Sequence, residues 1–549
     1  MSSCHRALQT CDVIHEVFSW LTPGPRYDEM TPEEEDGRRN ARHDLLNVVL
    51  VCRAFASPAL DVLWRELDDL LPVMQLLTES HDCEVEGLNA SGALVGGQEP
   101  SHFSHLISDP EWTRFRYYAR RVRVIHSSGF GTFEASMLLH LSHRSAGKAL
   151  FPCLRRLSHT ITSNLDIGLP PLVTSTLDDV SLTFTGELCC GTDADEASAL
   201  ARKVRDYAVH ESLCTLCTSA PSLRRLIITG LGRISSLLPL LRCHQLRHLH
   251  IEDLTLNPRS LRNLASMHYL RELDLKFQLI DCDISGLSGL TSLQSLTLSG
   301  RMYQIPLLLD VISASQLRTI RLSDLSNRAG YMECAEAIHA ASKFPLLQDF
   351  HLSADNGFVL SVGNPVQSAR LVEMLSPLLR HRSLRTLSVN RWQLGGFALS
   401  DSDMHALATA WPHIASLTLA VNRAEVVPTL QSLTTLARLC PSLLTLELPS
   451  LTILSAAQLA PVPGLGPHPL RTLEIGDPTR RAEAFDAAQV ARWLHRMFPR
   501  CSMPGECEDF SGFIADLLGE LKRLRRAAIA KDASGAGSGE GEGMAASLR

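Results

Sequence analysis

One six-residue pattern, apolar-x-x-apolar-x-apolar, constrains the fold of this chain more than any other feature of its sequence. It occurs twelve times, and only the first copy departs from it, because His159 stands at its last apolar position. Successive early copies begin 23 or 24 residues apart, and the later ones 27 to 37 residues apart. A repeat at a nearly fixed period predicts a solenoid, in which each repeat packs against its neighbours. The copies begin at Leu154, Leu177, Leu223, Leu246, Leu270, Leu293, Leu317, Leu347, Leu384, Ile414, Leu443 and Leu470.

One step between copies, from Leu177 to Leu223, is 46 residues long and therefore spans two periods. Either one copy has degenerated there, or one repeat carries an insertion. Residues 193–220 are predicted to form this extra turn, with a helix near 197–207.

Each repeat is predicted to contain one strand and one helix. The fourth and sixth residues of a hexad point to the same side of an extended chain, because strand side chains alternate. Between hexads, segments such as residues 260–267 have apolar residues at helical spacing and no β-branched residue. One strand and one helix cannot close a core alone, whereas stacked repeats can. The fold class predicted is therefore an α/β solenoid with parallel strands inside and helices outside.

This pattern resembles the leucine-rich repeat, whose parallel strands line the inside of a curved horseshoe. The asparagine that often closes the turn after the hexad is missing, and Leu254, Gln278, Arg301 and Leu325 stand in its place. The resemblance is therefore to the looser, helix-bearing repeats.

Composition and charge limit where the protein is expected to work and what it is expected to bind. A net charge of −7 and a pI near 6.3 give no general attraction to nucleic acid or anionic lipid. The 15 cysteines follow no framework spacing, and the first residues lack the apolar core of a signal peptide. The most apolar stretch, residues 45–64, is interrupted by Arg53 and Asp61, so it is not predicted to span a membrane. We expect an intracellular protein, in the cytoplasm, the nucleus or both, that binds neither nucleic acid nor membrane.

A different module precedes the repeats. Val13, Ile14, Val17, Phe18 and Leu21 have helical spacing, and residues 45–67 are rich in apolar side chains. Pro58 is expected to begin a third helix, because proline fits a first helical turn. So small a bundle has more apolar surface than it can bury, and exposed apolar helix faces are typical of a partner site.

The residues of this module resemble the F-box, which docks substrate receptors onto the Skp-family adaptor of SCF-type cullin–RING ubiquitin ligases. The resemblance rests on Val17-Phe18-x-x-Leu21, Leu45-Leu46, Val51-Cys52-Arg53-x-Phe55 and Leu63-Trp64-Arg65-x-Leu67. It implies adaptor contacts from Val17, Phe18, Leu21, Leu45, Leu46, Val51, Phe55, Leu63 and Trp64. Two departures are the missing Leu-Pro pair, replaced by Gln9-Thr10, and an acidic insertion at 22–44 that is predicted to be disordered.

The order of an F-box, the segment Trp112-x-Arg114-Phe115-x-x-Tyr118, and leucine-rich repeats is similar to a large class of fungal F-box proteins. The resemblance implies a non-catalytic subunit of a ubiquitin ligase complex that recruits a protein target for ubiquitin-dependent degradation. The alternative is a leucine-rich-repeat scaffold for protein binding that is unconnected with ubiquitin and uses the N-terminal helices as a cap.

The predicted domain organisation has five parts. Residues 1–77 form the F-box-like module, 78–110 a linker, 111–480 the solenoid, 481–531 C-terminal capping helices and 532–549 a disordered tail. The solenoid is expected to open with an aromatic helix and a strand at 122–124.

No catalytic motif stands out, and no cofactor is expected. The sequence has no P-loop, no Gly-x-Ser-x-Gly and no His-Glu-x-x-His. Cys214 and Cys217 form a lone CxxC, which is a weak zinc or redox signal and is better explained by two packed thiols. A hydrolase or another enzyme would need a pocket with convergent titratable groups.

The third and fifth residues of each hexad are predicted to point to the open side of the sheet. His248 and His250 should face Glu272 and Asp274 on the next strand, as a solvated ion-pair patch more than as a metal site. A protein target is expected to bind here, unless it binds the C-terminal loops or the convex helices instead. The candidate target-binding residues are Arg225, His248, His250, Glu252, Glu272, Asp274, Lys276 and Arg321.

Overall fold

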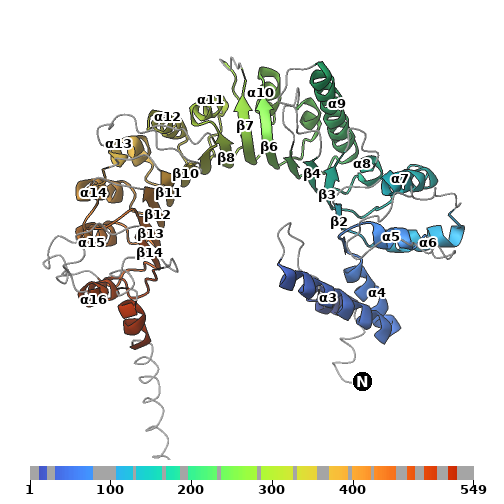
Figure 1. The fold of residues 1–549 in the computed structure, drawn as a ribbon, viewed down its shortest axis with the longest axis horizontal. Coiled ribbons are helices and arrows are strands. Elements are labelled where there is room, and N and C mark those ends of the chain that lie inside the picture. The colour runs from blue at the N-terminus through green and yellow to red at the C-terminus, as the bar shows by residue number, and fades with distance from the viewer. Residues whose placement is uncertain are drawn as a thin grey trace, which may run out of the picture. The chain divides into compact units, whose positions relative to one another are not determined.

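The computed structural model divides into two compact units (Figure 1). The N-terminal unit comprises Met1–Leu270 with Ile280–Cys282, and the C-terminal unit comprises Arg271–Leu279 with Asp283–Arg549. The residues that the structure describes are 11–21, 31–77, 107–127, 132–162, 168–185, 196–230, 237–280, 286–325, 331–354, 370–392, 398–421, 426–452, 466–475, 487–503, 517 and 519–527.

The N-terminal unit contains a ladder of parallel strands that pair in sequence order. Its strands are β1 (Glu66–Leu67), β2 (Val124–Ser127), β3 (Arg156–Ile161), β4 (Asp179–Phe184), β5 (Arg225–Thr229) and β6 (His248–Leu256). The helices between them are α5 (Leu71–Gln75), α6 (Asp109–Ala119), α7 (Thr132–Arg144), α8 (Leu169–Leu172), α9 (Glu196–Ser219), η2 (Leu238–Arg242) and α10 (Pro258–Ala265).

The C-terminal unit continues the same repeat with its own parallel ladder, again in sequence order. Its strands are β7 (Glu272–Leu279), β8 (Ser295–Gly300), β9 (Thr319–Asp324), β10 (Asp349–Ala354), β11 (Thr386–Trp392), β12 (Ser416–Val421), β13 (Thr445–Leu448) and β14 (Thr472–Ile475). The helices are η3 (Met302–Gln304), α11 (Ile305–Val311), α12 (Tyr331–Ala341), α13 (Leu371–Leu375), η4 (Ser376–Arg380), α14 (Asp401–Ala410), α15 (Leu430–Leu439) and α16 (Ala487–Met497). They lie on one side of the ladder (Figure 1).

The predicted fold class is confirmed, because each of the twelve hexads supplies one strand, β3 to β14. Side chains alternate as the pattern requires: in β8, Leu296 and Leu298 are fully buried, whereas Ser295 and Thr297 keep partial exposure. His159, the one departure from the pattern, is buried at the position of the missing apolar residue. Stacking of these buried rows gives each repeat the core that it cannot form alone.

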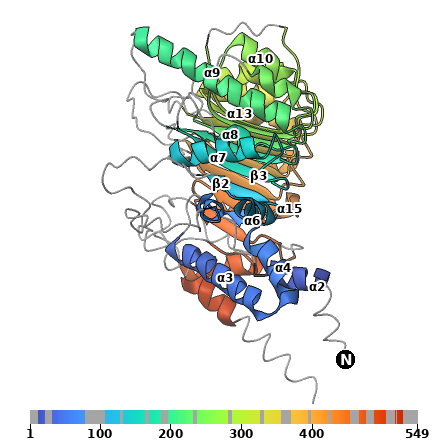
Figure 2. The ribbon, with the colours of Figure 1, turned by 90° about the vertical axis from the view of Figure 1, so that its right-hand side faces the viewer.

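The 46-residue step is an insertion and not a degenerate copy. β4 pairs directly with β5, so no strand lies between them. The added residues lengthen the connecting helix: α9 has 24 residues, far more than the predicted helix at 197–207, and extends past the neighbouring helices (Figure 2).

The N-terminal module consists of α2 (Cys11–Ser19), α3 (Pro32–Val51) and α4 (Arg53–Leu63), which pack together (Figure 2). The prediction that 22–44 is disordered is wrong for residues 31–44. Thr31 and Glu34 form a reciprocal capping box, Pro32 occupies the first turn, and three glutamates follow near the positive end of the helix dipole. Residues 22–30 lie outside the described part.

Pro58 does not begin a helix, which corrects a second expectation. The backbone of Cys52 is extended and ends α3, and α4 begins immediately after it at Arg53. Pro58 is buried within α4.

The strand ladder begins earlier than the predicted boundary at residue 111. Glu66 and Leu67 pair with β2 as β1, although they fall inside the range assigned to the helical module. At the other end, α16 matches the predicted capping helix, and residues 519–527 are helical. Most of the linker (78–106) and the tail (532–549) lie outside the described residues.

Candidate protein interface

The helices of the N-terminal module form their own small core. Ile14, Phe18, Leu45, Ala59 and Val62 are buried in one cluster. Leu21, Val48, Val49, Phe55 and Leu63 pack against it with partial exposure. The rings of Phe18 and Phe55 meet edge to face, with their centroids 5.4 Å apart. The module is therefore held by apolar contacts of its own.

Other large apolar side chains of the same helices remain in solvent. On α2 and the turn after it, Val13, Val17 and Trp20 follow helical spacing, and Trp20 is 83% exposed. At the end of α3, Leu46, Leu50 and Val51 are exposed, Leu50 by 78% and Val51 by 66%. Two groups of three such side chains, one on α2 and the turn after it and one at the end of α3, are typical of a surface that another molecule covers. We call these six residues the apolar helix surface.

The residues predicted to contact an adaptor separate into three groups by burial. Phe18 and Leu45 are buried in the core, so their side chains are not available to a partner. Leu21, Phe55, Leu63 and Trp64 are half-buried. Val17, Leu46 and Val51 are exposed.

Three exposed members of the apolar helix surface were not among the expected adaptor contacts. Val13 precedes Val17 by one turn, Trp20 follows Val17 by three residues, and Leu50 follows Leu46 by one turn. This spacing alone could have placed them on the same helix faces.

An ion-pair network joins the module to the first strands. The Arg38 side chain is nearly buried, and its Nη2 lies 3.2 Å from Glu66 Oε1 and 2.6 Å from Asp68 Oδ1. Arg42 Nη1 contacts Asp68 Oδ2 at 2.5 Å, and His126 Nε2 lies 3.2 Å from Glu66 Oε1. α3 is thereby attached to β1 and β2.

The pKa values of the two carboxyl groups show that this network favours the ionised form. Burial raises the pKa of Glu66, but the hydrogen bond from His126 and the charge of Arg38 outweigh it, so its pKa lies below the usual value. The pKa of Asp68 is lowered in the same way, with Arg42 and Arg38 outweighing burial.

A second joint links α4 to α6. Arg121 Nε lies 2.9 Å from Asp61 Oδ1, and the Trp64 ring lies 4.5 Å from the ring of Tyr118. The Arg121 guanidinium also stacks on Tyr117, 4.1 Å from its ring centre.

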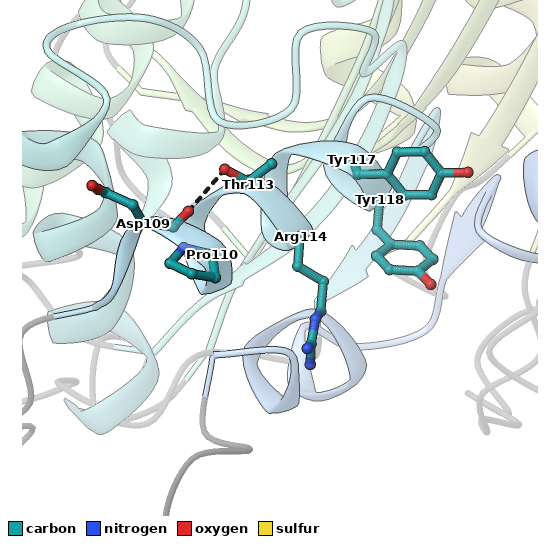
Figure 3. Close-up of a pocket in the computed structure, with 6 residues that line it drawn as sticks. All are labelled: Asp109, Pro110, Thr113, Arg114, Tyr117 and Tyr118. Carbon is teal, nitrogen blue, oxygen red and sulfur yellow. Dashed lines mark hydrogen bonds between the residues drawn. The ribbon is translucent and has the colours of Figure 1, made fainter.

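An open pocket of about 650 Å³ lies on α6 (Figure 3). Thr113 Oγ1 donates a hydrogen bond to the carbonyl oxygen of Asp109, while the Tyr117 and Tyr118 rings lie beside each other, with their centroids 5.2 Å apart. The lining of the pocket has one carboxylate, one guanidinium group and two phenol groups. The lining residues are Asp109, Pro110, Thr113, Arg114, Tyr117 and Tyr118.

The predicted target-binding residues lie on the open face of the strands, as expected from the hexads. Arg225 is exposed on β5, and His248, His250 and Glu252 are half-buried on β6, with His250 Nε2 3.3 Å from Glu252 Oε1. Glu272, Asp274 and Lys276 lie on β7, and Arg321 on β9. Because β6 belongs to the N-terminal unit and β7 to the C-terminal unit, the facing of the two histidines and two acids stays a prediction.

Two features considered from the sequence, a possible metal site and the lone CxxC, fall in the described part of the chain. No group of three or more His, Cys, Asp or Glu side chains is placed there to hold a metal ion. Cys217 is buried, and a hydrogen bond with Cys243, together with burial, raises the pKa of its thiol. Cys214 Sγ lies 3.5 Å from His210 Nε2. Among the described helices, none is long and apolar enough to cross a membrane.

Comparisons with known proteins give structural likeness only. No protein-family model matches the chain, and no curated protein matches it. Among solved structures, an internalin of Listeria monocytogenes has 15% identity and a TM-score of 0.35, and the match covers 69% of this chain and 96% of that one. TLR13 in complex with ssRNA13 has 15% identity and a TM-score of 0.34, over 66% of this chain and 54% of that one. The plant peptide hormone receptor RGFR1 in complex with RGF2 has 15% identity and a TM-score of 0.30, over 74% and 62%. The leucine-rich-repeat fold assignment rests on the strand ladder itself.

Proposed function

We propose that this protein is a substrate-recognition subunit of an SCF-type ubiquitin ligase. The N-terminal module would dock a Skp-family adaptor, and through it a cullin–RING ligase, while the repeats bind a protein target. The observation that carries the proposal is the apolar helix surface. It lies on the helices that bear the F-box-like motifs and is left exposed by the rest of the N-terminal unit.

The proposed activity needs no catalytic residue in this chain. A receptor of this kind acts by proximity, because it raises the local concentration of a target lysine near the ubiquitin thioester. The ligase works in the cytoplasm, the nucleus or both in this proposal.

The burial of individual residues decides which substitutions test the docking. Phe18→Asp would place a charge in the module's own core and unfold it, so the loss of adaptor binding would be uninformative. Leu50 is the better choice, because its side chain is 78% exposed and its replacement removes no core contact. Leu139 on α7 is a matched control, since it is an exposed leucine on a helix of the same unit.

The experiment is co-expression of the full chain with a Skp-family adaptor, followed by size-exclusion chromatography. We expect stoichiometric co-elution for the wild type and for Leu139→Asp. Leu50→Asp should lower the adaptor affinity by about 30-fold or more, because it would place a charge in an apolar contact. Failure of the wild type to co-elute, or equal binding by Leu50→Asp, would contradict the proposal.

The second candidate is a leucine-rich-repeat scaffold in which the helices serve as a cap. The ion pairs of Arg38 with Glu66 and Asp68 favour it, because they attach the module to the first strands. A cap of this kind predicts no adaptor in the co-expression, and a loss of repeat stability when residues 1–51 are removed.

A further inference from the structure

The open strand face of the C-terminal unit carries short side chains that end in hydroxyl groups. From β8 to β14 the strands are in register, so their outward residues form continuous rows across the ladder. The central row runs through Thr297, Arg321, His351, Ser388, Thr418, Glu447 and Glu474. The row beside it runs through Ser295, Thr319, Asp349, Thr386, Ser416, Thr445 and Thr472.

In the central row, the positive charge and the negative charges lie on different strands. Arg321 on β9 is exposed, and Glu447 and Glu474 stand as register partners on β13 and β14 at the other end. Four strand spacings separate Arg321 from Glu447, which is about 19 Å at about 4.8 Å each. An extended peptide covers that distance in about six residues.

The middle of the central row has no charged side chain, and its side chains project little from the sheet. His351 is half-buried, and burial together with the nearby Arg321 lowers its pKa, which favours the neutral ring. Ser388 and Thr418 are short and mostly buried, at 8% and 9% exposure, so they leave room for a peptide above them. In the row beside them, the hydroxyl groups of Thr386 and Ser416 keep partial exposure. Hydroxyl groups donate and accept hydrogen bonds, so these two match both the N–H and the C=O groups of a peptide backbone.

We propose that this face binds an extended segment of the target, laid across the strands from β9 to β13. The segment has an acidic side chain beside Arg321, a basic side chain about six residues away beside Glu447 and Glu474, and small or polar residues between them. Opposite charges at the two ends set its direction, and hydrogen bonds to its backbone hold the middle. This inference rests on the proposed function for its biological role, since it names the chemistry of the target, but the peptide binding itself needs no adaptor.

Selection from a random phage-displayed peptide library on the immobilised full-length chain tests the proposal. We expect enriched peptides to pair an acidic with a basic residue at a separation of five to seven positions. Affinities of the corresponding synthetic peptides are then measured by fluorescence anisotropy. Arg321→Glu, and separately Glu447→Lys with Glu474→Lys, should each weaken binding by about tenfold or more, because attraction becomes repulsion. Arg382→Glu, an exposed arginine of the same unit that lies outside the strands, should bind as the wild type does.

Three results would overturn this proposal: no enriched peptide, enriched peptides without the charge pair, or unchanged affinity in either charge-reversed variant. Adaptor co-elution is measured separately on Arg321→Glu. If that variant co-elutes normally but binds peptide as the wild type does, the peptide proposal fails while the proposed function stands. If the peptide binds as expected and no adaptor co-elutes with the wild-type chain, the proposed function fails while the peptide proposal stands.

Discussion

The helical module and the open strand face of the C-terminal unit present two opposite kinds of surface. The module exposes Trp20, Leu50 and Val51, which lose contact with water only when a partner covers them. The strand face exposes hydroxyl groups and separated charges, and the leucines of its strands point to the other side, as in β8. An apolar surface suits a partner that is recognised by shape and stays bound. A polar surface with fixed charges suits discrimination among sequences.

The largest expected effect is a loss of unfolding free energy, and it should distinguish a buried leucine from its exposed neighbour. Leu45 is completely buried and Leu46 is 48% exposed, although they are adjacent in α3. Leu45→Ala should lower the free energy of unfolding of the module by about 2–5 kcal/mol, whereas Leu46→Ala should lower it by about 1 kcal/mol or less. Urea unfolding, monitored by limited proteolysis within residues 11–63, measures both free energies of unfolding. Equal losses would show that the module's core is wrongly assigned.

A middle-sized effect is expected at the joint between the module and the first strands. Arg38→Ala would remove the shared partner of Glu66 and Asp68, which lie in a partly buried site. The free energy of unfolding should fall by about 2 kcal/mol, between the values for exposed and buried pairs. Arg39→Ala is the control, because the Arg39–Asp36 pair is largely exposed, and its effect should stay within about 0.5 kcal/mol. A larger loss of unfolding free energy for Arg39→Ala than for Arg38→Ala, measured by denaturant unfolding, would contradict this account of the joint.

The smallest expected effect is a change of local stability with pH, which should differ between the two units. His381 Nε2 lies 2.9 Å from the carbonyl oxygen of Ser342, and His468 Nε2 lies 3.0 Å from that of Cys440. Burial lowers the pKa of both rings despite these hydrogen bonds. A histidine with a lowered folded pKa contributes stability above its unfolded pKa, about 6.5, and that contribution is lost as the pH falls below 6.5.

The carboxyl groups of the N-terminal joint respond in a lower pH range. The pKa values of Glu66 and Asp68 are lowered, so their contribution is present above the ordinary values of 4.5 and 3.8 and is lost as the pH falls below them. Between pH 7.5 and 5.5, proteolysis with peptide mapping should therefore show more opening near His381 and His468 and no added opening near Glu66. His381→Gln with His468→Gln should remove this difference; a pH response that persists in that variant would contradict the assignment.

Much of the fold could be predicted from the sequence because its strands repeat one local pattern. Each hexad forms a strand because its apolar residues alternate in the way that a half-buried strand requires. The two strands outside the pattern fared worse: β1 has only two residues and was not predicted, and β2 begins at Val124, where the expected strand at 122–124 ends. The start of α3 was also missed, because the acidic composition of residues 31–36 suggested disorder, whereas Thr31 and Glu34 cap a helix there.

The candidate sites were less predictable for a different reason. Phe18 and Val17 belong to the same motif, yet one side chain points into the core and the other into solvent. Only the packing of α2 against α4 decides between them. The hydroxyl groups of β8 to β12 carried no signal in the sequence, because serine and threonine are common in strands and on surfaces alike.

The most direct test of the division between the two surfaces measures both kinds of binding in both kinds of variant. Adaptor co-elution and affinity for a library-selected peptide are determined for Leu50→Asp and for Arg321→Glu in the full-length chain. The account predicts that Leu50→Asp loses the adaptor and keeps the peptide, and that Arg321→Glu keeps the adaptor and loses the peptide. Loss of both partners in one folded variant, or retention of both in each, would contradict it.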